Sequence, residues 1–291
     1  MVAESSLRVL PGASPLFPDD PECLPEGSHV DGQAARRPVS DSADYVIIGS
    51  GAAGATAAVV LAEAGFSVIL LEEGPWVRTR DFGTTMPGAM SKMLRGAGTA
   101  VSMGRSFLVL MQGTCVGGST TVNSAIAWRA PEHVIDGWST DRGLGEHVTN
   151  LLLEPHYEAL ERELSVRSVS DEALGGNNAL FGEAARKLGF EAHRMKRYDT
   201  GCEGSAGCLT GCRTGRKQGM NITYVPRTLK AGGKIYSSTR VERVESRAGE
   251  AIEVVASMKS PTALVPLRVR ARRGVLVAAS AVQTPNVLRR S

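Results

Sequence analysis

The stretch from Asp44 to Glu72 constrains the fold more than any other part of the sequence. Residues 45–49 are a short apolar run typical of a buried parallel strand, and residues 52–64 are an alanine-rich segment that predicts a helix. A second apolar strand, at 67–71, runs directly into Glu72. Strand, glycine turn, helix, strand and acid fit within about 30 residues, the size of one βαβ unit. The sequence therefore predicts an α/β fold with a Rossmann-like start.

The first glycine-rich loop follows the first strand. We expect Gly49 to allow the tight turn, Gly51 to let the backbone approach a pyrophosphate, and Gly54 to let helix and strand pack closely. The helix then presents free N–H groups to phosphates. Glu72 lies 23 residues after Gly49, close to the spacing at which an acid binds ribose hydroxyls, and its charge disfavours NADP. Glu73 is the alternative, but the apolar run ends immediately before Glu72.

A second glycine-rich loop, residues 113–123, has a different design. Gly117, Gly118 and Ser119 would again bring bare backbone to a polar ligand, at the start of a short helix. Asn123 falls a little over one turn into that helix, where asparagine is a poor helix former, so we expect its amide to face a ligand such as a flavin edge. The alternative is an ordinary glycine turn with a surface asparagine. Two such loops in this order predict FAD, held along its length.

The rest of the chain divides by its periodicity. Residues 151–166 and 178–188 have the pattern of amphipathic helices. Three segments, 239–246, 251–258 and 267–272, then alternate by two, which predicts an antiparallel meander. A buried strand at 275–279 and a helix starting at Thr284-Pro285 follow. Residues 1–42 contain six prolines and no apolar core of a signal peptide. The expected divisions are a flexible leader (1–43), the first part of the FAD-binding domain (44–135), a helical insertion with a Cys-Gly loop (136–233) and the second part of the FAD-binding domain (234–291).

Composition narrows the class of partner. Residues 213–291 carry 16 Lys and Arg against 4 Asp and Glu, but no nucleic-acid motif accompanies this charge, and alternation along the strands favours solvated strand faces. We therefore expect no nucleic acid partner. No apolar run approaches the roughly 20 residues of a transmembrane helix. Five cysteines, an odd number, do not describe a disulfide scaffold, so we expect a cytoplasmic protein.

Three motifs together resemble the glucose-methanol-choline (GMC) oxidoreductase family. The dinucleotide fingerprint of that family ends in Leu-Glu-x-Gly, here residues 71–74, and continues with Gly-Gly-Ser-x-x-x-Asn, here 117–123. A further signature, with a Thr-Pro pair and two aliphatic residues, matches residues 280–291 up to its last glycine. The motifs occur in family order, and the resemblance covers everything except the leader.

The resemblance implies a site for non-covalently bound FAD, because the second loop lacks the histidine motif that attaches flavin in some members. It places the diphosphate on the first loop, at Gly49, Gly51, Ala53 and Gly54, and Glu72 on the adenosine ribose. Gly117, Gly118, Ser119 and Asn123 would lie along the isoalloxazine, and Val241 would contact the adenine.

The resemblance also implies the reaction. A histidine removes the proton of an alcohol substrate, and the carbon passes a hydride to flavin N5. None of the chain's histidines occupies a matching position, so we assign no catalytic residue; they are His29, His133, His147, His156 and His193. The closest resemblance is to bacterial relatives of long-chain alcohol and sterol oxidases, with the substrate and the electron acceptor left open.

Cys202, Cys208 and Cys212 lie among glycines and admit two interpretations. They could bind an iron–sulfur cluster, as some FAD-dependent dehydrogenases of this family do on a similar spacing. We prefer a tight glycine-rich loop with free thiols, because the spacing departs from the cluster-binding pattern. Zinc would need a fourth ligand.

The sequence stops at Ser291, early in a predicted helix and at the start of a substrate-binding domain. We therefore expect the cofactor-binding part of a longer enzyme, poorly soluble alone or binding FAD weakly. The alternatives are a non-catalytic FAD-binding fragment, a subunit completed by a separate C-terminal chain, and an iron–sulfur dehydrogenase.

Overall fold

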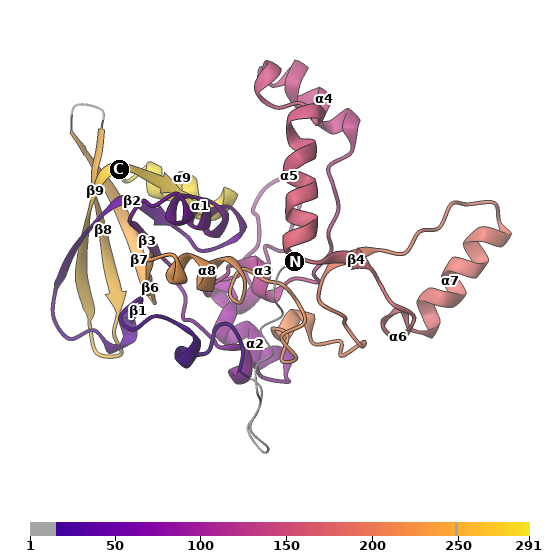
Figure 1. The fold of residues 1–291 in the computed structure, drawn as a ribbon, viewed down its shortest axis with the longest axis horizontal. Helices are drawn as coiled ribbons and strands as arrows, with labels where there is room; N and C mark the ends of the chain where they lie inside the picture. The colour runs from indigo at the N-terminus through magenta and orange to yellow at the C-terminus, as the bar shows by residue number, and fades with distance from the viewer. Residues whose placement is uncertain (1–15, 248–249) are drawn as a thin grey trace.

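The computed structural model of the chain describes residues 16–247 and 250–291. Its centre is a seven-stranded sheet in the order β1-β6-β3-β2-β9-β8-β7 (Figure 1). The first five strands in this order are parallel, and β8 and β7 join β9 as an antiparallel meander. The strands are β1 (His29–Asp31), β2 (Val39–Ile48), β3 (Val68–Leu71), β6 (Lys234–Ser237), β7 (Thr239–Arg247), β8 (Glu250–Lys259) and β9 (Leu264–Val277).

The predicted βαβ unit is confirmed and lies at the centre of the sheet. β2 pairs with β3 on one side and with β9 on the other, so it is a central strand, and its apolar run contributes to the buried clusters on both faces of the sheet. Helix α1 (Ala52–Glu63) connects β2 to β3. Val46 and Ile47, which point to opposite faces of β2, are both fully buried.

Two helices cover one face of this sheet. α1 packs beside α8 (Tyr224–Lys230), and both contact the sheet through a buried cluster that includes Ala58, Val59 and Leu229. Small alanines on α1 allow the helix to approach the strands closely. The end of the expected insertion, at α8, therefore packs with the nucleotide-binding layer.

The meander supplies most of the core on the other face. Val254, Leu267 and Val269 form one buried cluster with Val46 of β2, and α9 (Ser280–Leu288) adds Val287 beside β7. The predicted meander is confirmed, but the two strands expected at 267–272 and 275–279 are a single strand, β9. The reason is that Arg272 and Arg273 do not break the strand: they pair with Asp44 on β2.

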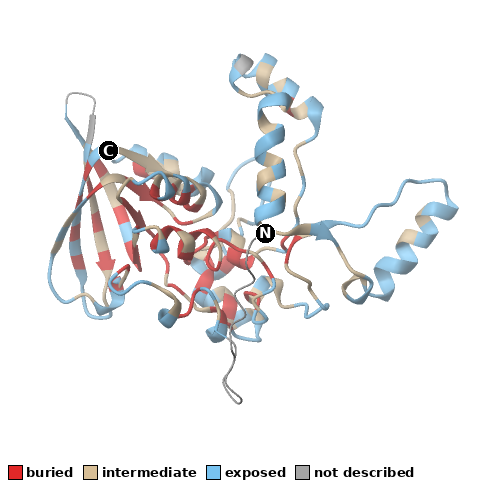
Figure 2. Cartoon of the chain, viewed as in Figure 1, coloured by how far each residue is buried: buried red, intermediate tan, exposed pale blue. Residues whose placement is uncertain are grey.

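Figure 1 shows two helical arms that extend from this body. The expected amphipathic helices are confirmed as α5 (Asn150–Glu163) and α7 (Gly176–Lys187), yet neither has a buried residue, and Figure 2 shows burial concentrated at the sheet. The apolar stripes predicted helices without predicting what they contact. The other elements here are α2 (Met86–Met93), α3 (Ser119–Val122), α4 (Glu132–Asp141), α6 (Asp171–Leu174) and the ribbon of β4 (Val166–Ser168) with β5 (Lys196–Tyr198).

The expectation of a leader over 1–43 is wrong for the part that the structure describes. Residues 29–31 form β1, which pairs in parallel with β6 at the sheet edge, and β2 already begins at Val39. Asp19 is fully buried and accepts hydrogen bonds from the main-chain N and Oγ1 of Thr79, at 2.8 and 3.1 Å. These contacts join segments 60 residues apart, so local composition could not indicate them. Residues 1–15 lie outside the described residues.

The last helix also begins earlier than predicted. α9 starts at Ser280, with Pro285 inside it, rather than at Thr284. Ser280 has a φ of +73°, which turns the chain sharply out of β9. Proline at the first helical position is a common signal, but here the strand end sets the start of the helix.

Candidate functional site

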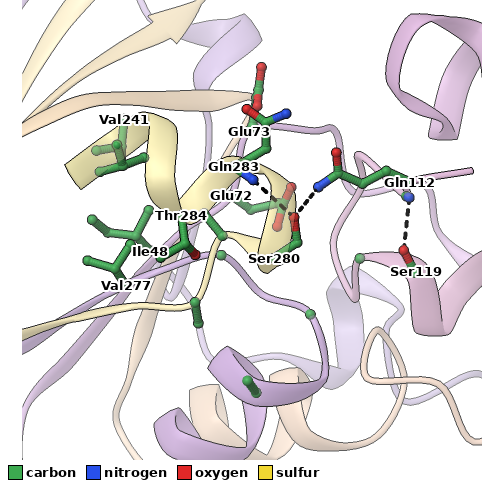
Figure 3. Close-up of a pocket in the computed structure, with 18 of the residues that line it drawn as sticks. Ile48, Glu72, Glu73, Gln112, Ser119, Val241, Val277, Ser280, Gln283 and Thr284 are labelled. Atoms are coloured by element: carbon green, nitrogen blue, oxygen red, sulfur yellow. Dashed lines mark hydrogen bonds between the residues drawn. The ribbon is translucent and has the colours of Figure 1, made fainter. Parts of the chain in front are cut away.

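A cavity of about 820 Å³ lies at the carboxyl ends of the parallel strands, where ligands of such sheets bind. Ile48, Leu71 and Val277, at the ends of β2, β3 and β9, line it together with both glycine-rich loops. Figure 3 shows the apolar side chains of Ile48, Val277 and Val241 on one side of the cavity and Gln112 and Ser119 on the other. The cavity therefore offers one apolar and one polar region.

The first loop has the backbone geometry that its glycines predicted. Gly49 has a φ of +100°, and a Cβ there would lie 2.5 Å from the carbonyl oxygen of Ala278. A Cβ on Gly54 would lie 1.9 Å from the carbonyl oxygen of Gly49, so helix and strand pack too closely for any side chain. Gly51 and Ala53 line the cavity at the start of α1. The first N–H groups of this helix have no intrahelical partners and can bind a phosphate.

The two glycine-rich loops contact one another. Gly118 has a φ of +54°, and a Cβ there would lie 2.9 Å from Cα of Gly51. Ser50, which is fully buried, connects the loops: its hydroxyl donates to Oε2 of Glu72 at 2.7 Å and accepts from the N–H of Gly117 at 3.1 Å. Ser50 was not among the residues predicted from the sequence. Its signal was a polar residue between the two glycines of a turn that should be buried.

Glu72 and Glu73 both line the cavity but differ in their partners. The Glu72 carboxylate is buried and accepts hydrogen bonds from Ser50 and from the N–H of Gly74, and burial raises its pKa. Burial alone would also raise the pKa of Glu73, but ion pairs with Arg95 at 2.5 Å and Lys259 at 3.0 Å outweigh it and lower the pKa to about 2. Glu73 is thus neutralised by cations, whereas the Glu72 charge contacts only neutral donors.

Asn123 ends α3 instead of lying within it. The helix stops at Val122, and Asn123 has extended backbone angles, with φ −92° and ψ 178°. Its Oδ1 accepts hydrogen bonds from the N–H of Ala125 at 3.0 Å and from the hydroxyl of Tyr198 at 2.5 Å. Because a main-chain N–H can only donate, this pairing assigns the oxygen and leaves Nδ2 as the end available to a ligand.

The structure brings most of the predicted residues together. Gly49, Gly51, Ala53, Glu72, Gly118, Ser119, Asn123 and Val241 line the cavity, whereas Gly54 and Gly117 lie behind its wall. Four other lining residues were not predicted from the sequence: Gln112, Thr239 and Arg240, which lie in no recognised motif, and Gln283, which lies in the signature at 280–291 but was given no role. Within residues 16–247 and 250–291, no histidine lines this cavity.

The three clustered cysteines have separate partners. Sγ of Cys208 accepts a hydrogen bond from Arg197, and Sγ of Cys212 accepts one from the N–H of Lys217. Sγ of Cys202 accepts one from the N–H of Gly204. In the described part of the chain, no three His, Cys, Asp or Glu side chains are placed to hold a metal ion. The geometry gives the iron–sulfur interpretation no support.

The fold and the cavity together define a dinucleotide-binding α/β protein. An FAD binding domain model matches residues 44–90, and the GMC oxidoreductase model matches residues 90–291. The second match covers more than half of the chain, so the chain belongs to the GMC oxidoreductase family. This confirms both the family resemblance and FAD as the cofactor. The glycine pairs that exclude side chains from the loops fit a diphosphate cradle.

Two of the similar sequences are named GMC-type oxidoreductases, and a third is named a long-chain-alcohol oxidase. An uncharacterized GMC-type oxidoreductase of Mycobacterium tuberculosis is 39% identical over 259 residues, which are 89% of this chain and 40% of that protein. Another from Sinorhizobium fredii is 35% identical, over 86% of this chain and 49% of that protein. The long-chain-alcohol oxidase FAO4B of Arabidopsis thaliana is 28% identical, over 69% of this chain and 26% of that protein. The chain thus spans less than half the length of these relatives.

Solved structures support the fold class. A formate oxidase of Aspergillus oryzae matches with a TM-score of 0.61 at 16% identity, over 85% of this chain and 47% of that one. An FAD-dependent oxidoreductase of Chaetomium thermophilum matches with a TM-score of 0.58 at 16% identity, over 84% and 46%. At such identity the likeness establishes the fold alone. None of the helices that the structure describes is long and apolar enough to cross a bilayer.

Proposed function

We propose that this chain is the FAD-binding part of an oxidoreductase that acts on the CH–OH group of an alcohol. The observation that carries the proposal is the cavity at the strand ends, which is lined by both glycine-rich loops together with Glu72 and Val241. The names of relatives, a long-chain-alcohol oxidase and an oxygen-dependent choline dehydrogenase, support an alcohol as the small-molecule substrate.

Each region of the cavity then has a role. The N-terminus of α1, at Gly51 and Ala53, would hold the diphosphate. Glu72 would accept a ribose hydroxyl through Oε1, which accepts a single hydrogen bond from Gly74. Val241 would contact the adenine, and Asn123 would offer Nδ2 to the flavin edge. FAD, when bound, supplies the acceptor for the hydride that leaves the alcohol carbon.

The proton of the substrate hydroxyl needs a base. The described wall of the cavity contains no histidine, and its carboxylates, Glu72 and Glu73, are held by the hydrogen bonds and ion pairs described above. We propose that the base comes from residues outside this sequence, in a longer chain or in a complementing C-terminal chain. On that basis the 291 residues alone would bind FAD without oxidising alcohols.

A matched pair of glycine variants tests the cofactor site. Gly118→Ala would place a Cβ 2.9 Å from Gly51 and obstruct the contact between the loops. Gly145→Ala carries the same backbone strain, with φ +52° against +54°, but its Cβ would meet nothing within 4 Å. Flavin fluorescence titration should show FAD affinity reduced at least tenfold by G118A and unchanged by G145A. Equal affinities in two folded variants would refute the proposal.

The reaction class needs a separate test. The FAD-loaded chain is mixed anaerobically with a long-chain primary alcohol, with and without a C-terminal portion supplied by a relative. We expect loss of the oxidised flavin absorbance only when the C-terminal portion is present. Reduction by the chain alone would contradict the assignment of the base to other residues.

A further inference from the structure

Lys217 is a buried lysine that no carboxylate neutralises among the described residues. Lys217 is only 4% exposed, and none of the ion pairs among the described residues includes it. Nζ instead donates to three main-chain carbonyls: Thr121 at 2.6 Å, Asn123 at 3.0 Å and Cys208 at 2.8 Å. An ammonium group has three N–H donors, so every donor is used.

One of these carbonyls belongs to Asn123, which lines the candidate site, and another to Thr121, which lies between the lining residues Thr120 and Asn123. Thr121 lies in the last turn of α3, and Asn123 is the residue that ends it. The last carbonyls of a helix have no intrahelical donor and carry partial negative charge, which a cation satisfies. α3 begins at Ser119, which lines the cavity. Lys217 therefore holds the helix that carries the second glycine-rich loop, from a position 96 residues later in the chain.

A neighbour of Lys217 fixes the Asn123 side chain. The Tyr198 hydroxyl donates to Oδ1 of Asn123, while the Tyr198 carbonyl accepts from the N–H of Gln218 at 3.0 Å. Ala125, the other donor to Oδ1, has a φ of +60°, a conformation that is costly for a residue other than glycine. Lys217 thus holds the Asn123 backbone and Tyr198 its amide, and only Nδ2 remains available toward the cavity.

The residues around Lys217 do not make its positive charge a source of stability for the fold. Burial is the main cause that lowers its pKa, to about 8, against the opposing effect of the thiols of Cys208, Cys212 and Cys115. Arg197, itself paired with Asp199, opposes the charge as well. Burying an ammonium group lowers the free energy of unfolding, and replacing a buried charge by an apolar side chain often leaves that free energy unchanged or raises it. A lysine here is better explained by what it orients.

We propose that Lys217 is a positioning residue, which holds α3 and Asn123 in the conformation that binds the flavin end of the cofactor. The inference rests on the proposed FAD site and adds a residue outside the cavity to it. Of the two glycine-rich loops, the Lys217 ammonium contacts only the second, through Thr121 and Asn123. The adenosine diphosphate half of the cofactor should therefore bind without it.

The test compares Lys217→Met with Lys187→Met, an exposed lysine on α7 whose side chain is 74% exposed. Each variant of the full 291-residue chain is titrated with FAD and with ADP, and the visible circular dichroism of the bound flavin is recorded. We expect K217M to lower FAD affinity at least tenfold, to alter the flavin spectrum, and to leave ADP affinity within twofold. K187M should leave all three unchanged.

The outcomes separate the two proposals. Wild-type chain that binds neither FAD nor ADP would overturn the cofactor site itself. Wild-type binding with unchanged FAD affinity and spectrum in K217M, or with an equal loss of ADP and FAD affinity, would overturn the positioning role alone. If K217M does not fold, a second variant, Tyr198→Phe, takes its place. It removes only the Tyr198 hydroxyl that donates to Oδ1 of Asn123, and it should still alter the flavin spectrum. An unaltered spectrum in Y198F would also overturn the inference.

Discussion

Gly51 and Gly54 of the first loop lie three residues apart, but their replacement by alanine should have different effects: one should reduce FAD binding and the other the stability of the fold. In Gly54→Ala the new Cβ would lie 1.9 Å from the carbonyl oxygen of Gly49, where ordinary contact needs at least 3.4 Å. In Gly51→Ala the nearest atom, Cα of Gly118, is 3.9 Å away, and the φ of −69° is one that alanine adopts freely. G54A is thus a packing change and G51A a change of the cavity surface.

The magnitudes follow from these contacts. Overpacking costs roughly 1–3 kcal/mol, and both clashing groups in G54A are backbone that cannot rotate away, so we expect about 3 kcal/mol or more. G51A should change the free energy of unfolding by about 1 kcal/mol or less, from a weaker helix N-cap. A Cβ between the N–H groups and the diphosphate should remove at least one charge-assisted hydrogen bond, about 1.5–3 kcal/mol, or roughly 10- to 150-fold in FAD affinity.

Urea unfolding of the FAD-free chain and fluorescence titration with FAD measure both effects. G54A should unfold at much lower urea, while G51A should unfold like wild type and bind FAD weakly. A G54A chain as stable as wild type would refute the packing argument. A G51A chain that is folded and binds FAD with wild-type affinity would refute the placement of the diphosphate.

Three other variants give simpler predictions. Burial is the main cause that raises the pKa of Asp19 to about 6 and lowers that of His29 to about 4. As pH rises from about 4 to 6, Asp19 therefore lowers the free energy of unfolding and His29 raises it, each by about 3 kcal/mol at most, and the two nearly cancel. Urea unfolding across this range measures the free energy of unfolding at each pH. With increasing pH it should rise more steeply in Asp19→Asn than in wild type, and less steeply in His29→Gln. Curves of both variants that run parallel to the wild-type curve would contradict both pKa shifts. Glu72→Gln replaces one of the two acceptor oxygens by an NH2 donor, and both oxygens accept hydrogen bonds in the structure. Calorimetric FAD titration should therefore show weaker binding, and urea unfolding a loss of about 1–3 kcal/mol. Wild-type values for both would contradict the role of Glu72.

The sequence predicted the nucleotide-binding part of the fold because its signals are local. A buried strand, a glycine turn and a helix each leave a pattern within a dozen residues. Seven of the eight predicted residues on the cavity wall lie in these local motifs, whereas the eighth, Val241, was implied only by the family resemblance. The edge strand β1 left no such pattern. Its pairing with β6 uses main-chain groups over 200 residues apart, and proline-rich surroundings concealed it.

The site residues that the sequence did not reveal depend on contacts between distant segments. In the sequence, Ser50 is a small residue between two glycines with no indicated role, whereas in the structure it is buried and hydrogen-bonded to Glu72 and Gly117. In the sequence, Lys217 is one of many basic residues in the C-terminal part, and only the structure shows that its ammonium donates to three main-chain carbonyls. Asn123 was identified by its poor fit to a helix, and the structure shows why: the helix ends at the residue before it.

The central claim is that the cavity holds FAD with its adenosine at Glu72 and Val241 and its flavin at the second loop. Calorimetric titration of the purified chain with FAD, ADP and FMN tests it most directly, because FMN lacks the adenosine half. The account predicts one FAD per chain at saturation, competition by ADP, and FMN binding at least tenfold weaker than FAD. A folded chain that binds no FAD, or binds FMN as tightly as FAD, would contradict it.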